Sequence, residues 1–362
     1  MEAAFRCIPL LRTGGELPDA EGLRPSLGVV HFSHLGSGRE QNSKQTMRQE
    51  DFEKRYRDLS TWYRSSFTER RIGSSGGGTL RVALPNSNSG DALAVVVNGR
   101  TEYLEKYLEF ARDLRQRGVV TVLYDHCGQG NSDRQLADRQ KGYIDSFQTY
   151  VTDLGRVIDT ARSDRGLAPV NLISHSMGGT VAALFGHRHP EQVKKMVLGS
   201  PMCAIITGSR VPQFLIRTLA AAGCGLGFGD CYMPTKGPYR PDMQFRNNPF
   251  TSDENRFNFN KFLTNSLDFA PLGGPTFRWL HESYKAMRKI NALAEQVICP
   301  HLTLVAAGDQ VIKKAVVKRF CERTCNGSYK EYPGVRHELF METDPVRDDI
   351  IARVTAFLTE EG

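Results

Sequence analysis

The stretch VNLISHSMGGT, residues 170–180, decides how this chain of 362 residues is expected to fold. An apolar run typical of a buried strand leads into a Gly-Gly pair, where the next helix would begin. Packing alone can explain a Gly-rich turn between a strand and a helix. The spacing of Ser174, Ser176 and Gly178 also matches small–x–Ser–x–Gly, the pattern of a sharp turn that holds a serine hydroxyl above the edge of a sheet. The remaining sequence has to decide whether Ser176 is a turn residue or a nucleophile.

Strand-like and helical segments alternate on both sides of this turn. The apolar runs of strand length are 92–99, 119–125, 193–201 and 301–309. Helical periodicity fills 102–118 and 147–162 between them. Short runs that are apolar throughout are typical of strands buried on both faces. The alternation therefore predicts an α/β fold, with a mostly parallel sheet and helices on both of its faces.

Two segments fall outside this alternation. Residues 1–72 show little periodicity except for one amphipathic helix, predicted from the helical spacing of Phe52, Tyr56, Leu59 and Tyr63, so we expect a partly flexible N-terminal extension. A second segment is too long and too irregular for a loop within a compact domain, and we expect it to form an inserted, mainly helical cap. The expected division is 1–72 for the extension, 73–201 and 291–362 for the two parts of the core, and 202–290 for the cap.

A nucleophilic serine needs a base that accepts its proton. In a sheet with this type of turn, the acid and then the base follow the serine along the chain. Asp309 closes the strand-like run 301–309, which would bring its carboxylate to the same sheet edge as Ser176. Of the nine histidines, His337 alone lies beyond Asp309. We therefore predict Ser176 as nucleophile, Asp309 as acid and His337 as base.

An acyl-transfer site also needs N–H donors for the oxygen that becomes negatively charged. The backbone N–H of Met177 opens the helix after the serine and is one natural donor. The turn after the run 92–99 is expected to supply the second donor from the backbone N–H of Arg100.

The amino-acid composition excludes several classes of protein. With 40% hydrophobic and 24% charged residues, the chain has the composition of a soluble globular protein. No run approaches 18 uncharged apolar residues, and the N-terminal apolar patch is too short for a signal peptide, so we expect a cytoplasmic location without a membrane span. The net charge is +7, but basic and acidic residues are interleaved, as on an ordinary solvated surface, so no nucleic-acid partner is expected. A lipid surface would suit any excess charge better than DNA. The eight cysteines show no zinc-ligand pattern, so no metal is expected.

Several motifs resemble the lysophospholipase and monoacylglycerol lipase branch of the α/β-hydrolases. They are GRTEYLEKYLEFARDLRQRG, YDHCGQGNS, SHSMGG, GGPTFRWLHES and GVRHELFMETD, spread over residues 80–362. The sequence looks most like the bacterial membrane-associated lysophospholipases of this branch, which belongs with the serine aminopeptidase-like hydrolases. The resemblance implies the α/β-hydrolase fold and the same Ser176, Asp309 and His337 triad. Cys127 stands where this branch usually has arginine. Asn98 stands where the lipases have histidine, a replacement that also occurs among the lysophospholipases.

The resemblance implies hydrolysis of a single-chain lipid ester through an acyl-enzyme, without metal or organic cofactor. His175 is then expected to shape the substrate pocket. Three apolar residues of the cap are expected to hold the acyl chain: Phe214, Leu215 and Leu219. The basic charge and the apolar cap also predict peripheral contact with the inner face of a membrane. The oligomeric state is left open.

Two other functions stay open from the sequence. The same scaffold serves short-chain esterases and peptidases, although a peptidase would need a cluster of acidic cap residues to hold a free amine. The chain is also compatible with a non-catalytic binding protein on a hydrolase scaffold. The intact set of Ser176, Asp309 and His337 argues against that reading.

Overall fold

The computed structural model describes residues 47–87, 90, 92–163, 168–208, 211–269 and 271–360. The flexible part that we expect at the start of the N-terminal extension lies outside the described residues, because the description begins at residue 47. The predicted amphipathic helix is present as α1, Gln49–Ser66, and buries Phe52, Leu59 and Tyr63.

The described residues form an eight-stranded sheet whose strand order is β1-β2-β4-β3-β5-β6-β7-β8. The first two strands make an antiparallel hairpin, and β2 pairs antiparallel with β4. All other neighbours are parallel. The strands are β1 Phe67–Gly73, β2 Thr79–Pro85, β3 Ala92–Val97, β4 Val119–Tyr124, β5 Val170–His175, β6 Val193–Gly199, β7 His301–Ala306 and β8 Gly327–Tyr332. The mostly parallel α/β sheet expected from the sequence is therefore confirmed.

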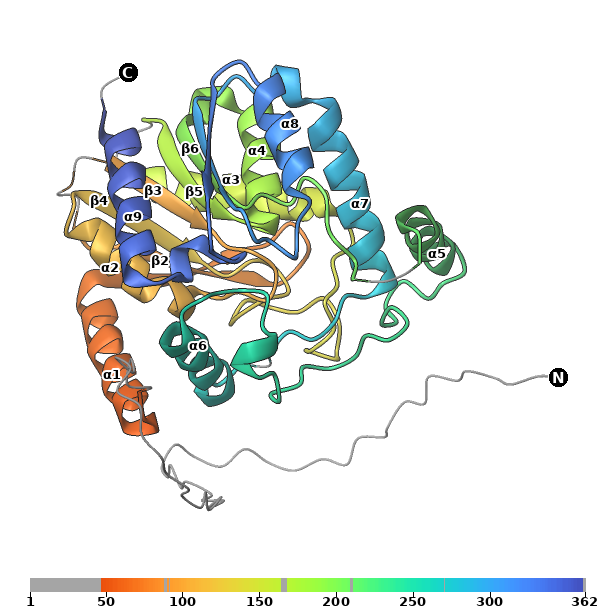
Figure 1. Ribbon diagram of the computed structural model, residues 1–362, viewed down its shortest axis with the longest axis horizontal. Coiled ribbons are helices and arrows are strands. Elements are labelled where there is room, and N and C mark those ends of the chain that lie inside the picture. Colours follow the sequence, from red (N-terminus) through yellow and green to blue (C-terminus); the bar gives the residue numbers. More distant parts are fainter. Residues whose placement is uncertain are drawn as a thin grey trace. The chain divides into compact units, whose positions relative to one another are not determined.

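Helices cover both faces of this sheet (Figure 1). On one face lie α3 Phe147–Ser163, α4 Met177–Arg188, α7 Phe277–Ala292 and α8 Lys314–Arg323. On the other face α1 is joined by α2 Leu108–Arg115 and α9 Asp344–Thr359. Successive residues of a strand point to opposite faces. Val95 and Val97 accordingly pack in the first layer, and Ala94 and Val96 pack in the second.

The segment between β6 and β7 carries α5 Gln213–Gly225, the short 3-10 helix Phe245–Asn247 and α6 Glu254–Ser266 before α7 begins. Helix α5 packs against α7, whereas α6 lies near α1 and the 3-10 helix Leu104–Tyr107. The long irregular stretches on both sides of α6 match the irregular composition of the sequence there.

The division into extension, core and cap stays a prediction, but two elements lie across its boundaries. Strand β1 is already part of the sheet, although it falls within the expected extension. Helix α7 lies mostly within the range expected for the cap, yet its buried residues share a hydrophobic core with α3 and α4. The N-terminal helix is thus joined directly to the edge of the sheet.

Candidate active site

Ser176 lies in the turn between β5 and α4 with φ 51° and ψ −115°, in the region that side chains other than glycine rarely adopt. The turn brings α4 against the end of β3. A Cβ added at Gly178 would lie 2.0 Å from the Val97 carbonyl oxygen, so no larger residue fits there. Ser174 takes the place where glycine is more usual, and its hydroxyl donates to the Val197 carbonyl at 2.8 Å. This close packing holds the Ser176 hydroxyl beyond the end of the sheet.

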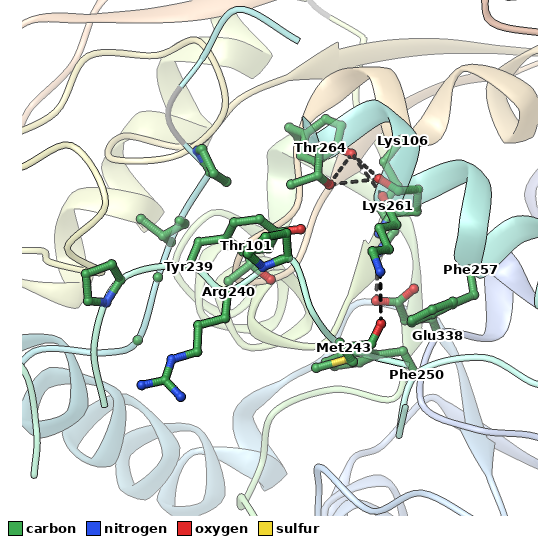
Figure 2. A pocket seen from close by; sticks show the side chains of 18 of the residues that line it. Thr101, Lys106, Tyr239, Arg240, Met243, Phe250, Phe257, Lys261, Thr264 and Glu338 are labelled. Atoms are coloured by element: carbon green, nitrogen blue, oxygen red, sulfur yellow. Dashed lines mark hydrogen bonds and ion pairs between the residues drawn. The ribbon is translucent and has the colours of Figure 1, made fainter. Parts of the chain in front are cut away.

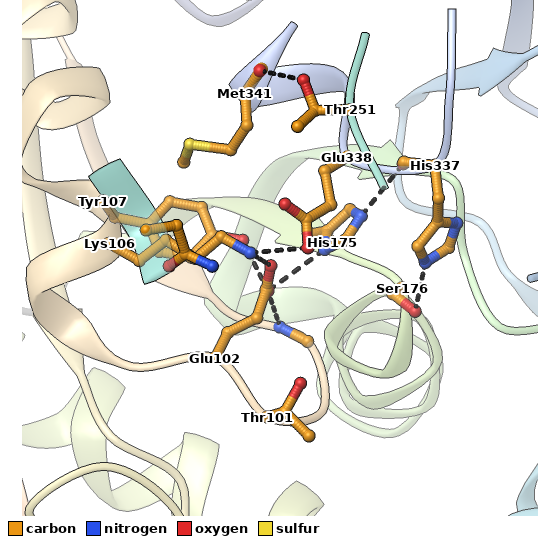
Figure 3. A network of polar contacts seen from close by, with 12 residues as sticks. Thr101, Glu102, Lys106, Tyr107, His175, Ser176, Thr251, His337, Glu338 and Met341 are labelled. Carbon is orange, nitrogen blue, oxygen red and sulfur yellow. Dashed lines mark hydrogen bonds and ion pairs between the residues drawn. The ribbon is translucent and has the colours of Figure 1, made fainter. Parts of the chain in front are cut away.

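The structure brings the three predicted site residues together in one hydrogen-bonded chain. The Nε2 atom of His337 lies 2.9 Å from Ser176 Oγ. Figure 3 draws the contact between these two side chains as a dashed line. The Nδ1 atom of His337 lies 2.7 Å from Asp309 Oδ2. Each residue follows the carboxyl end of a parallel strand, namely β5, β7 and β8, which explains why they meet at one edge of the sheet.

The surroundings of Asp309 favour its charged form. Burial alone would raise the pKa of this carboxyl, but the hydrogen bond from His337 and that residue's charge outweigh it, and the pKa lies below its usual value. Its other oxygen accepts the backbone N–H groups of Val311 at 2.8 Å and Ile312 at 3.0 Å. The carboxylate is thus fixed in position and directed at the imidazole.

The two predicted oxyanion donors come from two different turns, Met177 from the turn after β5 and Arg100 from the turn after β3. Met177 is the first residue of α4, where backbone N–H groups lack partners within the helix. Arg100 lies in the turn after β3, just before Thr101, which has a positive φ of 68°. The guanidinium of Arg100 lies over the Trp279 ring, 4.8 Å from its centroid. The role of its backbone N–H as the second donor stays a prediction.

A buried charged network lies directly behind the triad, and sequence reasoning missed it (Figure 3). Lys106 Nζ lies 2.8 Å from Glu102 Oε1 and 2.7 Å from Glu338 Oε1. His175 Nδ1 lies 3.1 Å from Glu102 Oε2, and its Nε2 lies 3.2 Å from the carbonyl oxygen of His337. Glu102 and Lys106 are four residues apart, and this helical spacing was the only signal of the network in the sequence.

The network changes the interpretation of His175, which was expected to shape the substrate pocket. Its side chain is buried, and it does not line the large cavity described below. Burial lowers the pKa of His175, but the charge of Glu102 and the hydrogen bond to it prevail and raise it. A protonated His175 donates from both ring nitrogens, to Glu102 and to the backbone of His337. It therefore supports the loop that carries His337.

A cavity of about 620 Å³ adjoins the buried network and shares Lys106 and Glu338 with it (Figure 2). It begins at Thr101 and Glu338, the neighbours of Arg100 and His337 in the chain, but Ser176 itself is not part of its wall. Its apolar wall consists of Tyr103, Met243, Phe250, Phe257, Phe269, Leu272 and Met341. Most of these residues come from the irregular segments around α6, where the sequence shows no periodicity.

The three cap residues expected to hold an acyl chain lie elsewhere. Phe214, Leu215 and Leu219 stand on α5 with exposed fractions of 61%, 46% and 46%, and none of them lines the cavity. The side of α5 that meets α7 uses small residues, because a Cβ at Gly223 would lie 2.3 Å from the Phe277 ring. The large side chains of α5 therefore face outward.

Among the residues that the structure describes, no group of His, Cys, Asp and Glu side chains is arranged to hold a metal ion. None of the helices in those same residues is long and apolar enough to span a membrane.

Comparison with known proteins adds a family to this geometry. The profile of the family described as serine aminopeptidase, S33, matches residues 88–344. Lysophospholipase L2 of Escherichia coli K12 is 32% identical over 280 residues, which cover 75% of this chain and 82% of that protein. A probable lysophospholipase L2 of Haemophilus influenzae is 29% identical over 75% of this chain and 84% of its own length. A soluble variant of monoglyceride lipase from Saccharomyces cerevisiae shares the fold, with a TM-score of 0.64 and 16% identity over 81% of this chain and 95% of its own.

Proposed function

The chain belongs to the serine aminopeptidase S33 family of α/β-hydrolases, and we propose that it cleaves the carboxylic ester of a single-chain lipid through a Ser-Asp-His triad. The observation that carries the proposal is the hydrogen-bonded chain from Ser176 through His337 to Asp309, with separations of 2.9 Å and 2.7 Å. Nucleophile, base and orienting carboxylate lie within the distances that proton transfer requires.

The first half of the proposed reaction forms an acyl-enzyme. His337 Nε2 accepts the proton of Ser176 Oγ as that oxygen attacks the ester carbonyl carbon. Asp309 holds the imidazole in the required tautomer and stabilises the imidazolium. The backbone N–H groups of Met177 and Arg100 bind the negatively charged oxygen of the tetrahedral intermediate. The imidazolium then protonates the leaving alcohol oxygen, and the ester C–O bond breaks.

The second half releases the fatty acid. Water takes the place of the alcohol, gives a proton to His337 and attacks the acyl carbon. The tetrahedral intermediate collapses, and Ser176 Oγ leaves with the proton returned by the imidazolium. All proton transfers involve side chains present in the chain, and no cofactor takes part in this scheme.

The substrate class rests on the cavity beside the buried network and on the relatives. Its aromatic and aliphatic wall suits an acyl chain, and the E. coli relative is named a lysophospholipase. A peptidase would need a free carboxylate to hold the substrate's amine. Within the described wall of the cavity the one carboxylate is that of Glu338, which already pairs with Lys106 at 2.7 Å. Lipid ester hydrolysis is therefore the better fit than aminopeptidase activity.

A panel of substrates with matched acyl chains tests this assignment. It consists of an oleoyl lysophospholipid, 1-oleoylglycerol, p-nitrophenyl butyrate and an aminoacyl p-nitroanilide. We expect kcat/KM to be highest for the two oleoyl esters, because the apolar wall binds their chain in the transition state as well as in the ground state. Preference for the aminoacyl amide would contradict the lipid assignment. Preference for p-nitrophenyl butyrate would favour a short-chain esterase.

We also propose that α5 touches the membrane surface. The exposed apolar residues at this helix form the α5 patch, defined as Phe214, Leu215, Leu219, Leu226 and Phe228, with exposed fractions between 46% and 72%. Large exposed apolar patches mark interaction sites. The net charge of +7 adds attraction to anionic lipid. A cytoplasmic location stays a prediction from the sequence.

Replacing Phe214, Leu215 and Leu219 together by serine is expected to weaken binding to phosphatidylglycerol vesicles by about tenfold or more, because each side chain loses its burial in the lipid. Co-sedimentation measures the binding, and hydrolysis of p-nitrophenyl butyrate in solution should be unchanged. The matched control is Ile298→Ser, which removes an equally exposed apolar side chain at 52% outside α5. Vesicle binding that is the same in all three proteins would contradict the assignment.

A further inference from the structure

We propose that Lys236, Arg240 and Lys261 form a subsite for the phosphate of a substrate head group, so that the enzyme prefers lysophospholipids to neutral monoacylglycerols. The inference rests on the proposed function and assigns a role to a part of the cavity that the triad and the acyl chain do not use. It follows from the charges on the wall of the cavity.

Five cations and one carboxylate belong to this wall. They are Lys106, Lys236, Arg240, Arg256, Lys261 and Glu338. Lys106 is neutralised by Glu338 and by Glu102 at 2.7 and 2.8 Å. Arg256 pairs with Glu109 at 3.2 Å, Asp253 at 3.3 Å and Asp344 at 2.7 Å. The two buried cations are thus occupied by carboxylates of the protein itself.

The other three cations have no such partner. Across the described parts of the chain, no carboxylate forms an ion pair with Lys236, Arg240 or Lys261. Lys261, on α6, donates to the Met243 carbonyl oxygen at 3.2 Å, which leaves two of its three N–H groups for a ligand. Figure 2 shows Arg240 and Lys261 among the side chains around the cavity. The wall therefore carries an uncompensated positive charge.

The cavity thus combines an apolar wall with three cations that have no carboxylate partner. Its apolar residues, such as Phe257 and Phe269, suit a hydrocarbon chain, and its cations suit an anion. Arginine and lysine are the side chains best suited to phosphate, arginine through its planar fork and lysine as a point charge. A lysophospholipid has both parts, a chain and a phosphate, whereas a monoacylglycerol lacks the anion. The chemistry of the wall consequently matches the lysophospholipid better.

The preference can be measured with two substrates that differ in the head group alone. These are 1-oleoyl-lysophosphatidylglycerol and 1-oleoylglycerol, both below the concentrations at which they aggregate. Because both release oleate, attraction of the fatty acid product to the cations affects the two reactions equally. The variant is Lys236→Gln/Arg240→Gln/Lys261→Gln. A second variant, Lys236→Gln/Arg240→Gln, changes exposed residues alone and keeps the test valid if loss of the half-buried Lys261 impairs folding.

We expect the triple variant to lose about tenfold or more in kcat/KM for the lysophospholipid, the ratio that 1.4 kcal/mol corresponds to. Its kcat/KM for 1-oleoylglycerol should stay within a factor of about two. In the unmodified protein, added glycerol 3-phosphate should inhibit hydrolysis of the lysophospholipid competitively, and the inhibition should weaken as salt is added. The control variant Lys194→Gln/Lys289→Gln/Arg319→Gln makes the same change in net charge at exposed positions outside the cavity wall. It should behave like the unmodified protein, which separates local binding from long-range attraction.

Each outcome decides one of the two proposals. Equal losses for both substrates, or no loss for either, would overturn the head-group subsite while leaving the esterase activity intact. An equal loss in the control variant would show that net charge and not these three residues causes the effect, and would also overturn it. If the unmodified protein hydrolyses none of the esters and does not react with a fluorophosphonate, the proposed function itself fails.

Discussion

Replacement of Ser176 by alanine is expected to lower kcat for ester hydrolysis by about a millionfold, to the level left by binding and the oxyanion donors alone. Without Oγ no acyl-enzyme can form, and His337 has no hydroxyl within reach. The protein should fold normally, because alanine is smaller than serine and the strained turn is held by the packing of Gly178 against Val97. Initial rates with the oleoyl esters measure the loss, and circular dichroism checks the fold.

The matched control for this variant is Ser174→Ala. It removes a buried hydroxyl from the same strand, one that donates to the Val197 carbonyl at 2.8 Å. Loss of such a hydrogen bond costs about 1 kcal/mol of stability, but the reacting atoms stay in place. Activity within a few-fold of the unmodified protein is therefore expected. Residual turnover by Ser176→Ala comparable to that of Ser174→Ala would contradict the assignment of the nucleophile.

Replacement of Asp309 by asparagine is expected to lower kcat by about ten-thousandfold. An amide has nearly the same shape as the carboxylate, and its oxygen can still accept the N–H groups of Val311 and Ile312. Its NH₂ group would then face His337 Nδ1 and favour the tautomer with the proton on Nε2, which cannot accept the proton of Ser176. The loss should appear in kcat more than in KM, because Asp309 does not contact the cavity.

The pH dependence of stability offers a second readout for this variant. The pKa of Asp309 is lower in the folded protein than its ordinary value of 3.8. Its charged form therefore stabilises the fold at neutral pH, and this contribution disappears as the pH falls below 3.8 through the lowered folded value. In urea titrations at pH 7, the free energy of unfolding should be higher for the unmodified protein than for Asp309→Asn. In strong acid the two proteins should have the same free energy of unfolding. The control variant Asp268→Asn changes an exposed residue of the loop after α6. It should lower neither kcat nor the free energy of unfolding at pH 7.

Most strands of the core were predictable because each of them corresponds to one continuous apolar run in the sequence. The apolar runs that form β3, β4, β5 and β7 are buried on both faces, and such runs separated by helical segments leave few arrangements other than a parallel sheet. The positions of Ser176, Asp309 and His337 at strand ends followed from this order. Their mutual distances required the structure, because the sequence contains no information on how the three loops bend.

The cavity was less predictable because it depends on contacts between distant segments. Its wall joins the turn after β3 to irregular segments around α6 that have no period from which an orientation can be inferred. The apolar residues of α5 looked like a lining because they are large. The sequence did not reveal that α5 would meet α7 through Gly223 and leave Phe214 exposed. An apolar residue buries itself only when a partner surface is available.

The network behind the triad shows a similar limit. Glu102 and Lys106 have the spacing of a pair on a helix surface, and exposed pairs of this kind contribute little to stability. In the structure both are buried and joined to His175 and Glu338, in contact with the backbone of His337. Burial changes their role from surface charges to supports of the active-site loop, and burial of a charged side chain is rarely evident from the sequence.

A fluorophosphonate probe shows whether Ser176 is an activated nucleophile. The probe reacts covalently with a serine whose proton is removed by a base, and digestion followed by mass spectrometry locates the adduct. We predict a single adduct on the peptide that contains Ser176, and none in Ser176→Ala. An unlabelled protein, or an adduct that persists on another residue in Ser176→Ala, would contradict the account.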